Sequence, residues 1–292
     1  MSYNTIGYAV EDRVLTITLN RPEAMNAFTV EMCNELVDAI NCASNDDAVS
    51  VIVFTGAGKA YCAGMDLSVD GNVFGLDESQ NPGWQDLEER FEAPEIVDGV
   101  RDTGGRVTLA LYDCNKPVIA AINGVAVGIG ATMTLAMDIR LISSKGRMGF
   151  VFSKIGITPE ACSTWFLPRL VGMSKALEWT YSGEILDAQT VKEGGLVTAV
   201  YEPDELLPAA YALARKIADN TSPVGVALTR QMMYRNSAAA HPVEAHKVES
   251  LMIFDISQKD GREGVQAFME KRKPQFTQKA PSDMPALFPW WE

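Results

Sequence analysis

One carboxylate in the chain lies in a setting that could serve proton transfer. Residues 156–165, GITPEACSTW, place Glu160 among mostly apolar neighbours, after Pro159, which fixes its own backbone and lacks an N–H donor. The segment from Cys162 is typical of the first turn of a helix, where the helix dipole would stabilise a carboxylate by about 0.3–1 kcal/mol. In an apolar pocket the same carboxyl group would have a raised pKa and could exchange protons near neutral pH. The sequence leaves both interpretations open.

Two turns rich in small residues could supply the rest of such chemistry. Residues 124–133 (GVAVGIGATM) follow an apolar strand and open a helix, and residues 61–67 (YCAGMDL) form a turn after a buried strand. Small residues leave backbone N–H groups free, and two such donors can stabilise a developing oxyanion. The alternative is a pair of tight turns without a chemical role.

Several other kinds of site are not matched. Gly128 and Gly130 form GxG, but the third glycine of a dinucleotide-binding fingerprint is missing. In HPVEAH, His241 and His246 are five residues apart, whereas a helix brings metal ligands together at a spacing of three or four. The five cysteines are scattered and contain no CxxC pair. We therefore expect no metal, no separate cofactor and no disulfide framework, and a solvated helix start at HPVEAH.

Composition narrows the class of protein. The 292 residues are 47% hydrophobic and 22% charged, as in ordinary globular proteins. A net charge of −13 argues against nucleic-acid binding, which needs a basic surface. The first residues do not have the basic flank and apolar run of a signal peptide. No apolar stretch is long enough to span a bilayer. We therefore expect a cytoplasmic protein.

The hydrophobic pattern predicts an α/β core. Residues 14–19 alternate as in a half-buried strand, and Thr29 is a suitable cap for a helix running to about Asn45. Residues 50–58 (SVIVFTGAG), 116–124 (KPVIAAING) and 138–143 (DIRLIS) are apolar runs typical of strands buried on both faces. Strands that alternate with helices indicate the α/β class.

The predicted organisation is a core over residues 1–203 and a helical region over residues 204–292. Residues 68–106 break the core pattern as a turn-rich, acidic and partly helical excursion that we interpret as a lid. The last twelve residues, PSDMPALFPWWE, are apolar enough that they should pack on the protein itself or on a neighbouring subunit.

Together these segments resemble the crotonase (enoyl-CoA hydratase/isomerase) superfamily. The resemblance runs through LTITLNRPEAMNAF, VFTGAGKAYCAGMDL, KPVIAAINGVAVGIGATMTLAMDIRL and EGVQAFMEKRKPQF, and it omits residues 68–106 and the last dozen. It implies a spiral of ββα units followed by a helical trimerisation region, and a homotrimer or hexamer. It also implies an acyl-coenzyme A thioester substrate, with coenzyme A as part of that substrate.

The resemblance assigns roles to particular positions. The oxyanion hole would consist of the N–H groups of Met65 and Ile129. Substrate contacts would come from Ala24, Met25, Lys59, Ala63, Leu67 and Gly128, and from Phe268 and Lys271 near the end of the chain, which could serve a neighbouring subunit. Glu23 stands where some relatives have a cation.

The carboxylates decide which reaction is expected. Hydratases of the family use two glutamates, and these positions are Thr132 and Phe152 here. The isomerases use a single glutamate at the position of Glu160, for which Phe152, Ile157 and Trp165 would provide apolar surroundings. We therefore expect isomerisation of 3-enoyl-CoA to 2-enoyl-CoA. Hydration, thioester hydrolysis and acyl-CoA binding without catalysis are the alternatives.

Overall fold

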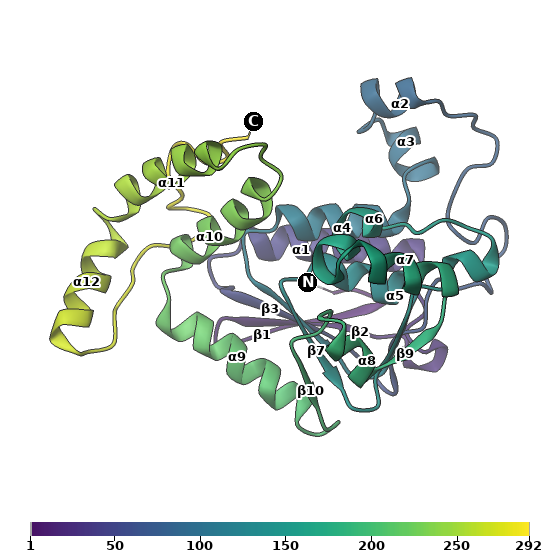
Figure 1. Ribbon diagram of the computed structural model, residues 1–292, viewed down its shortest axis with the longest axis horizontal. Coiled ribbons are helices and arrows are strands. Elements are labelled where there is room, and N and C mark those ends of the chain that lie inside the picture. The colour runs from purple at the N-terminus through teal and green to yellow at the C-terminus, as the bar shows by residue number, and fades with distance from the viewer. Residues whose placement is uncertain (1, 292) are drawn as a thin grey trace.

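Two β-sheets form the centre of the fold in the computed structural model, which describes residues 2–291 (Figure 1). The larger sheet has the order β1-β2-β3-β5-β7-β10 and is parallel except for the β1–β2 pair. Its strands are β1 (Ile6–Glu11), β2 (Val14–Leu19), β3 (Val51–Gly56), β5 (Val118–Ile122), β7 (Ile139–Ser143) and β10 (Ala199–Tyr201).

The second sheet consists of short strands in the order β4-β6-β8-β9. They are β4 (Ala60–Cys62), β6 (Val125–Val127), β8 (Arg147–Gly149) and β9 (Ile185–Asp187). Strand β4 runs parallel to β6, with Cys62 opposite Ala126. Because parallel neighbours end at the same edge of a sheet, the turns that follow β4 and β6 lie side by side.

Helices cover both faces of the larger sheet. The α-helices are α1 (Val30–Ser44), α2 (Trp84–Glu89), α3 (Pro94–Gly99), α4 (Thr103–Asp113), α5 (Ile129–Thr132), α6 (Ser163–Val171), α7 (Met173–Ser182), α8 (Ala188–Glu193), α9 (Leu206–Asn220), α10 (Pro223–Asn236), α11 (Pro242–Ile256) and α12 (Asp260–Glu270). Short 3-10 helices span Pro22–Ala24, Met133–Ala136 and Phe152–Ile155. None of the helices within residues 2–291 combines the length and the apolar character needed to cross a bilayer.

The strand pattern explains why helices lie on both faces. In β3, Ile52 and Phe54 pack with α1 and α4 on one face, while Val51 and Val53 pack against α9 on the other. The predicted double-sided burial and the α/β class are confirmed. The predicted cap is also confirmed, because the Thr29 hydroxyl accepts a 3.1 Å hydrogen bond from the N–H of Met32 at the start of α1.

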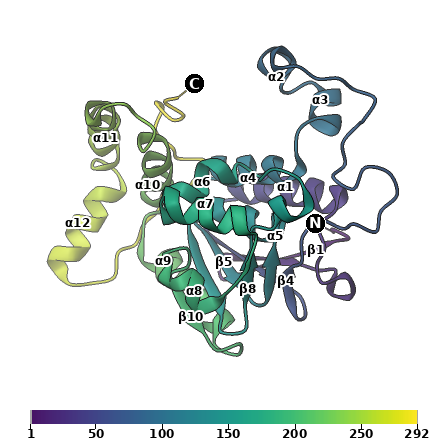
Figure 2. The ribbon, with the colours of Figure 1, turned by 45° about the vertical axis from the view of Figure 1, so that its right-hand side comes forward.

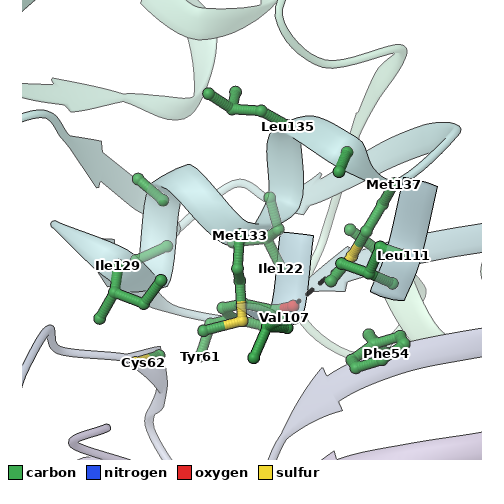
Figure 3. Close-up of a cluster of buried hydrophobic side chains, with 14 of the residues drawn as sticks. Phe54, Tyr61, Cys62, Val107, Leu111, Ile122, Ile129, Met133, Leu135 and Met137 are labelled. Atoms are coloured by element: carbon green, nitrogen blue, oxygen red, sulfur yellow. Dashed lines mark hydrogen bonds between the residues drawn. The ribbon is translucent and has the colours of Figure 1, made fainter. Parts of the chain in front are cut away.

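A cluster of buried side chains joins this core to the segment after Gly128 (Figure 3). Figure 3 shows Val107 and Leu111 of α4, Ile122 of β5, and Ile129 and Met133 gathered in one cluster. The first turn of α5 is therefore packed into the hydrophobic core and is not part of an exposed loop.

The C-terminal helices α10–α12 stand beside the sheet body (Figures 1 and 2), whereas α9 packs on the larger sheet. The tail returns onto α10 and α11, with Phe288 and Trp290 packed against a cluster that contains Val224 and Met252. Arg235 lies over the ring of Trp291 at 3.4 Å. The expected packing of the apolar tail on the protein itself is confirmed.

The predicted excursion is partly helical, as expected, and α2 and α3 project away from the body in both views (Figures 1 and 2). Its predicted end at residue 106 is four residues too late, because α4 already begins at Thr103. Asp102 caps this helix, and Val107 and Leu111 bury it in the core. The capped, amphipathic start of α4 therefore belongs to the body of the protein.

Candidate active site

A cavity of about 330 Å³ opens where the turns after β4 and β6 meet. Five segments line it, and most of the lining side chains are apolar. These segments are the turn after β4 (Ala63, Gly64, Met65, Leu67), the excursion (Phe74, Leu76), the start of α4 (Asp102, Thr103), the turn after β6 (Val127, Gly128, Ile129) and the segment before α6 (Val151, Phe152, Ile155, Ile157, Thr158, Glu160).

The two small-residue turns touch each other at their glycines. Gly64 and Gly128 have left-handed φ angles of +109° and +56°, which glycine adopts without strain. A Cβ atom on Gly128 would lie 4.0 Å from the Cα atom of Gly64. In the described part of the chain, the N–H groups of Met65 and Ile129 make no hydrogen bond, so both amides beside this contact are available to a ligand oxygen.

A polar network that the sequence pattern does not reveal holds the turns on both sides of β4. The buried Asn26 side chain donates to the carbonyls of Ala57 at 2.9 Å and Ala60 at 2.8 Å, and accepts from the N–H of Arg21 at 2.8 Å. The Arg21 guanidinium in turn pairs with Asp66 at 2.8 Å. Hydrogen bonds from Ser68 and Arg21 lower the pKa of Asp66 to about 2. In the sequence, Arg21 and Asn26 stand out in the segment RPEAMN before α1. The segment does not reveal the partners of their side chains.

Glu160 is partly buried and reaches two other segments through its carboxylate. Oε1 accepts a 2.6 Å hydrogen bond from the hydroxyl of Thr132. Oε2 lies against Gly104, where an added Cβ atom would approach it to 1.8 Å. The next two residues, Ala161 and Cys162, have left-handed φ angles of +57° and +52°, a strained conformation for side-chain-bearing residues that is typical of functional sites.

This environment favours the proton-exchange interpretation of Glu160 over the helix-charge interpretation. Helix α6 begins at Ser163, so Glu160 lies before the cap and outside the first turn. Burial is the main cause that raises the pKa of Glu160, to about 8, and the neighbouring Asp102 raises it further, against a lowering by the Thr132 hydrogen bond. A helix dipole acting on an exposed carboxylate would lower the pKa instead.

Two of the three expected apolar neighbours of Glu160 are present. Phe152 and Ile157 line the cavity together with Glu160. Trp165 does not line it: its ring packs edge-on against Tyr112 and Phe166, and Arg169 covers it at 3.8 Å. Because Trp165 lies on α6 beyond the αL turn at Cys162, its side chain belongs to the helix interface and not to the cavity.

The predicted substrate contacts lie in three parts of the structure. Ala63, Leu67 and Gly128 line the cavity. Ala24 and Met25 lie next to it, since the Met25 carbonyl accepts a 3.1 Å hydrogen bond from the N–H of Ala63.

Lys59 is exposed, and its neighbour Gly58 lies beside Pro22 of the Ala24 turn, since a Cβ atom added to Gly58 would be 3.1 Å from the Pro22 side chain. Phe268 and Lys271 lie at the end of α12, on the far side of the molecule from α5 (Figures 1 and 2). The fold of a single chain does not bring these two residues to the cavity.

Comparison with known proteins identifies the family. Residues 9–279 match the family described as Enoyl-CoA hydratase/isomerase. The chain belongs to the enoyl-CoA hydratase/isomerase family. It is 40% identical over 267 residues to Enoyl-CoA hydratase AFT3-1 of Alternaria alternata, covering 91% of this chain and 83% of that protein. It is 36% identical to 1,2-epoxyphenylacetyl-CoA isomerase of Escherichia coli K12, covering 92% and 97% of the two chains.

A solved structure of this family has the same fold. The crystal structure of a probable enoyl-CoA hydratase/isomerase from Mycobacterium abscessus matches with a TM-score of 0.80 at 31% identity, over 94% of this chain and 99% of that one. The predicted crotonase fold is therefore confirmed. The relatives are named both hydratases and isomerases, so the comparisons establish an enzyme of this family but do not decide which reaction it catalyses.

The histidines of HPVEAH lie at a helix start. Residues 2–291 contain no group of three or more His, Cys, Asp or Glu side chains arranged to hold a metal ion. His241 instead caps α11, where its Nδ1 accepts a 3.1 Å hydrogen bond from the N–H of Val243. The solvated helix start predicted for HPVEAH is confirmed.

Proposed function

We propose that this protein isomerises 3-enoyl-CoA to 2-enoyl-CoA, with Glu160 as the single acid/base. The observation that carries the proposal is the position of the Glu160 carboxyl group, which shares one apolar cavity with the free N–H groups of Met65 and Ile129. The two glutamate positions of the family's hydratases hold Thr132 and Phe152. Neither side chain exchanges protons near neutral pH.

The proposed mechanism uses these groups in sequence. The thioester oxygen accepts hydrogen bonds from the amides of Met65 and Ile129, which stabilise the negative charge that develops on it. The Glu160 carboxylate removes a proton from the α carbon, and a dienolate forms. The resulting carboxylic acid returns the proton to the γ carbon, which moves the double bond into conjugation. Loss of one such amide donor typically raises the activation barrier by roughly 3–4 kcal/mol. The mechanism requires no metal or further cofactor.

Hydration is the second candidate, because a second carboxyl group lines the cavity. Asp102 is exposed there, next to the Glu160 loop, and the pair could hold a water molecule. Phe152 argues against this arrangement, since it places a buried aromatic ring at the position of a water-holding glutamate. An apolar wall excludes the water that hydration would add to the β carbon of the conjugated thioester, while reprotonation of the dienolate by Glu160 needs no water.

We also propose a homotrimer or a multiple of it. Helices α11 and α12 expose Phe254, Phe268 and Met269, with Phe268 83% exposed, and such apolar faces are typical of subunit contacts. In an assembly, Phe268 and Lys271 could reach the coenzyme A moiety bound to a neighbour. The alternative for these residues is a contact that serves assembly alone.

The deciding experiment incubates the protein with panels of 3-enoyl-CoA and 2-enoyl-CoA thioesters. Isomerisation changes the absorbance of the conjugated thioester without a change in mass, hydration adds the mass of one water, and hydrolysis releases a free thiol. We expect isomerisation, and a fall in turnover by a factor on the order of 10² to 10⁴ in Glu160→Gln. Coenzyme A binding should stay unchanged in this variant.

Glu178→Gln, at an exposed position on α7, is the matched control and should retain full turnover. If Glu160→Gln keeps more than about a tenth of wild-type turnover, Glu160 is not the acid/base. Binding of acyl-CoA without turnover of any thioester in the panels would favour the non-catalytic alternative.

A further inference from the structure

We propose that Asp102 is a positioning residue that holds the Glu160 loop and whose charge adds to the effect of burial on Glu160, so that Glu160 becomes a base at a higher pH. The proposal rests on the proposed role of Glu160 and deepens it. Asp102 lies outside the segments whose roles the family resemblance assigns. Its side chain joins two elements that meet at the cavity, the start of α4 and the loop before α6.

Asp102 holds the backbone of the Glu160 loop through hydrogen bonds. One oxygen of Asp102, Oδ1, accepts hydrogen bonds from the N–H of Gly105 in α4 and from the N–H of Ala161 at 3.0 Å. Ala161 follows Glu160 directly and has a left-handed φ angle of +57°. Such a conformation persists only where the surroundings hold it, and the bond to Asp102 is a specific contact that does so.

The charge of Asp102 also acts on the Glu160 carboxyl group. The groups that face Glu160 are Asp102 at the cap of α4, Thr132 from α5, Cys62 from β4 and Cys162 from its own loop. Burial raises the pKa of Cys62 to about 12 and also raises that of Cys162, so both thiols stay neutral near pH 7. Two N–H donors, that of Gly105 in the first turn of α4 and that of Ala161 in the loop before α6, point at Oδ1 of Asp102. Asp102 is therefore the charged group that acts on Glu160.

The nearby cations do not cancel this charge. Arg101 is paired with Glu92 at 3.1 Å, and Arg106 lies 3.8 Å from Asp98 and donates to Asn34 at 2.8 Å. Neither cation acts on the Glu160 carboxyl group. A negative charge beside a buried carboxyl group keeps that group protonated to higher pH and makes its ionised form a stronger base.

Asp102→Asn separates the two parts, because the amide keeps an oxygen for Gly105 and Ala161 but removes the charge. In isomerase assays, the acid limb of the pH profile of kcat/KM should move down by about one unit or more. Activity about one unit below the wild-type limb should rise severalfold relative to the plateau. Asp102→Ala should instead lose turnover at every pH, because the loop is released.

Asp113→Asn is the matched control. Asp113 is the last residue of α4. A rise of 1.5 Å per residue puts it about 16 Å from Asp102, and its carboxylate forms an ion pair with Arg235. This variant should leave the limb in place. A limb that stays at the wild-type pH in Asp102→Asn would overturn the electrostatic part, and full turnover in Asp102→Ala would overturn the tether.

A measurement without substrate keeps this test independent of the proposed reaction. The infrared band of a protonated carboxylic acid, assigned to Glu160 by its loss in Glu160→Gln, should persist above pH 7 in the wild type. Its midpoint should fall in Asp102→Asn and stay unchanged in Asp113→Asn. An equal midpoint in the wild type and Asp102→Asn refutes the inference, even if isomerisation is observed. A shifted midpoint without isomerisation would refute only the proposed function.

Discussion

Oε2 of Glu160 occupies the space that a side chain at Gly104 would need. A Cβ atom added to Gly104 would lie 1.8 Å from that oxygen, 2.4 Å from Cδ1 of Ile129 and 3.0 Å from Cβ of Ala161. Three parts of the site therefore converge on one glycine in the first turn of α4. The backbone of Gly104 is helical, so the position requires glycine for space and not for conformational freedom.

Gly104→Ala should consequently displace the Glu160 carboxylate and leave the fold intact. Turnover should fall at least about 100-fold, because a base moved from its place loses most of the benefit of orientation. Circular dichroism and the thermal midpoint report folding, and steady-state kinetics report the displacement. Gly225→Ala, where the nearest atom would be 3.5 Å away, is the control and should keep wild-type rates. Wild-type turnover in Gly104→Ala would show that Glu160 is not needed in the observed position.

Glu160 should also make stability depend on pH. Its pKa in the folded protein, about 8, exceeds the ordinary value of 4.5, so between these values the folded state keeps a proton that the unfolded state has lost. The contribution of Glu160 to the free energy of unfolding is therefore fully present below pH 4.5. It is lost as the pH rises toward 8.

Glu160→Gln does not titrate and should therefore gain stability over the wild type as the pH rises. The gain should grow by at most about 1.4 kcal/mol per pH unit and level off above the folded pKa. Urea denaturation at several pH values measures it. A difference between the two proteins that does not change with pH would contradict the raised pKa of Glu160.

The excursion should close over the acyl group, since Phe74 and Leu76 already line the cavity. Leu76→Ala removes part of a partly exposed apolar contact, so KM for acyl-CoA should rise about fivefold, equivalent to about 1 kcal/mol. Trp84→Ala, at a 75% exposed position on α2 outside the cavity lining, should have no effect. Hydrogen exchange of the excursion, from residue 68 to residue 101, should slow when acyl-CoA binds, and equal exchange with and without acyl-CoA would argue against a lid.

The network around Asn26 should be important for both stability and turnover. Asn26→Ala removes the three hydrogen bonds of a buried side chain and places alanine at a left-handed φ angle of +55°, so the free energy of unfolding should fall by about 3 kcal/mol. Because Asn26 also holds the backbone of Arg21, whose guanidinium pairs with Asp66 next to Met65, kcat should fall as well. Asn45→Ala, at the exposed end of α1, should change stability by less than about 0.5 kcal/mol. Similar stability losses in both variants would remove the special role of Asn26.

The sequence by itself determined the class of fold, the family and the carboxylate worth testing. Continuous apolar runs such as residues 118–122 indicate strands buried on both faces, and this pattern is local to each strand. Thr29 predicted the start of α1 because a cap acts on N–H groups only a few residues away. Glu160 stood out through its neighbours in the chain. All of these are short-range signals.

The tertiary structure alone decided what surrounds Glu160. Strands of three residues, such as β4 and β6, are too short to show a period, so the sheet that brings Met65 beside Ile129 was not visible in the pattern. Thr132 lies 28 residues before Glu160, and Asp102 lies 59 residues before Ala161, yet both pairs are hydrogen-bonded. Burial and neighbouring charge set the pKa of a carboxyl group, and both arise only when distant segments pack together.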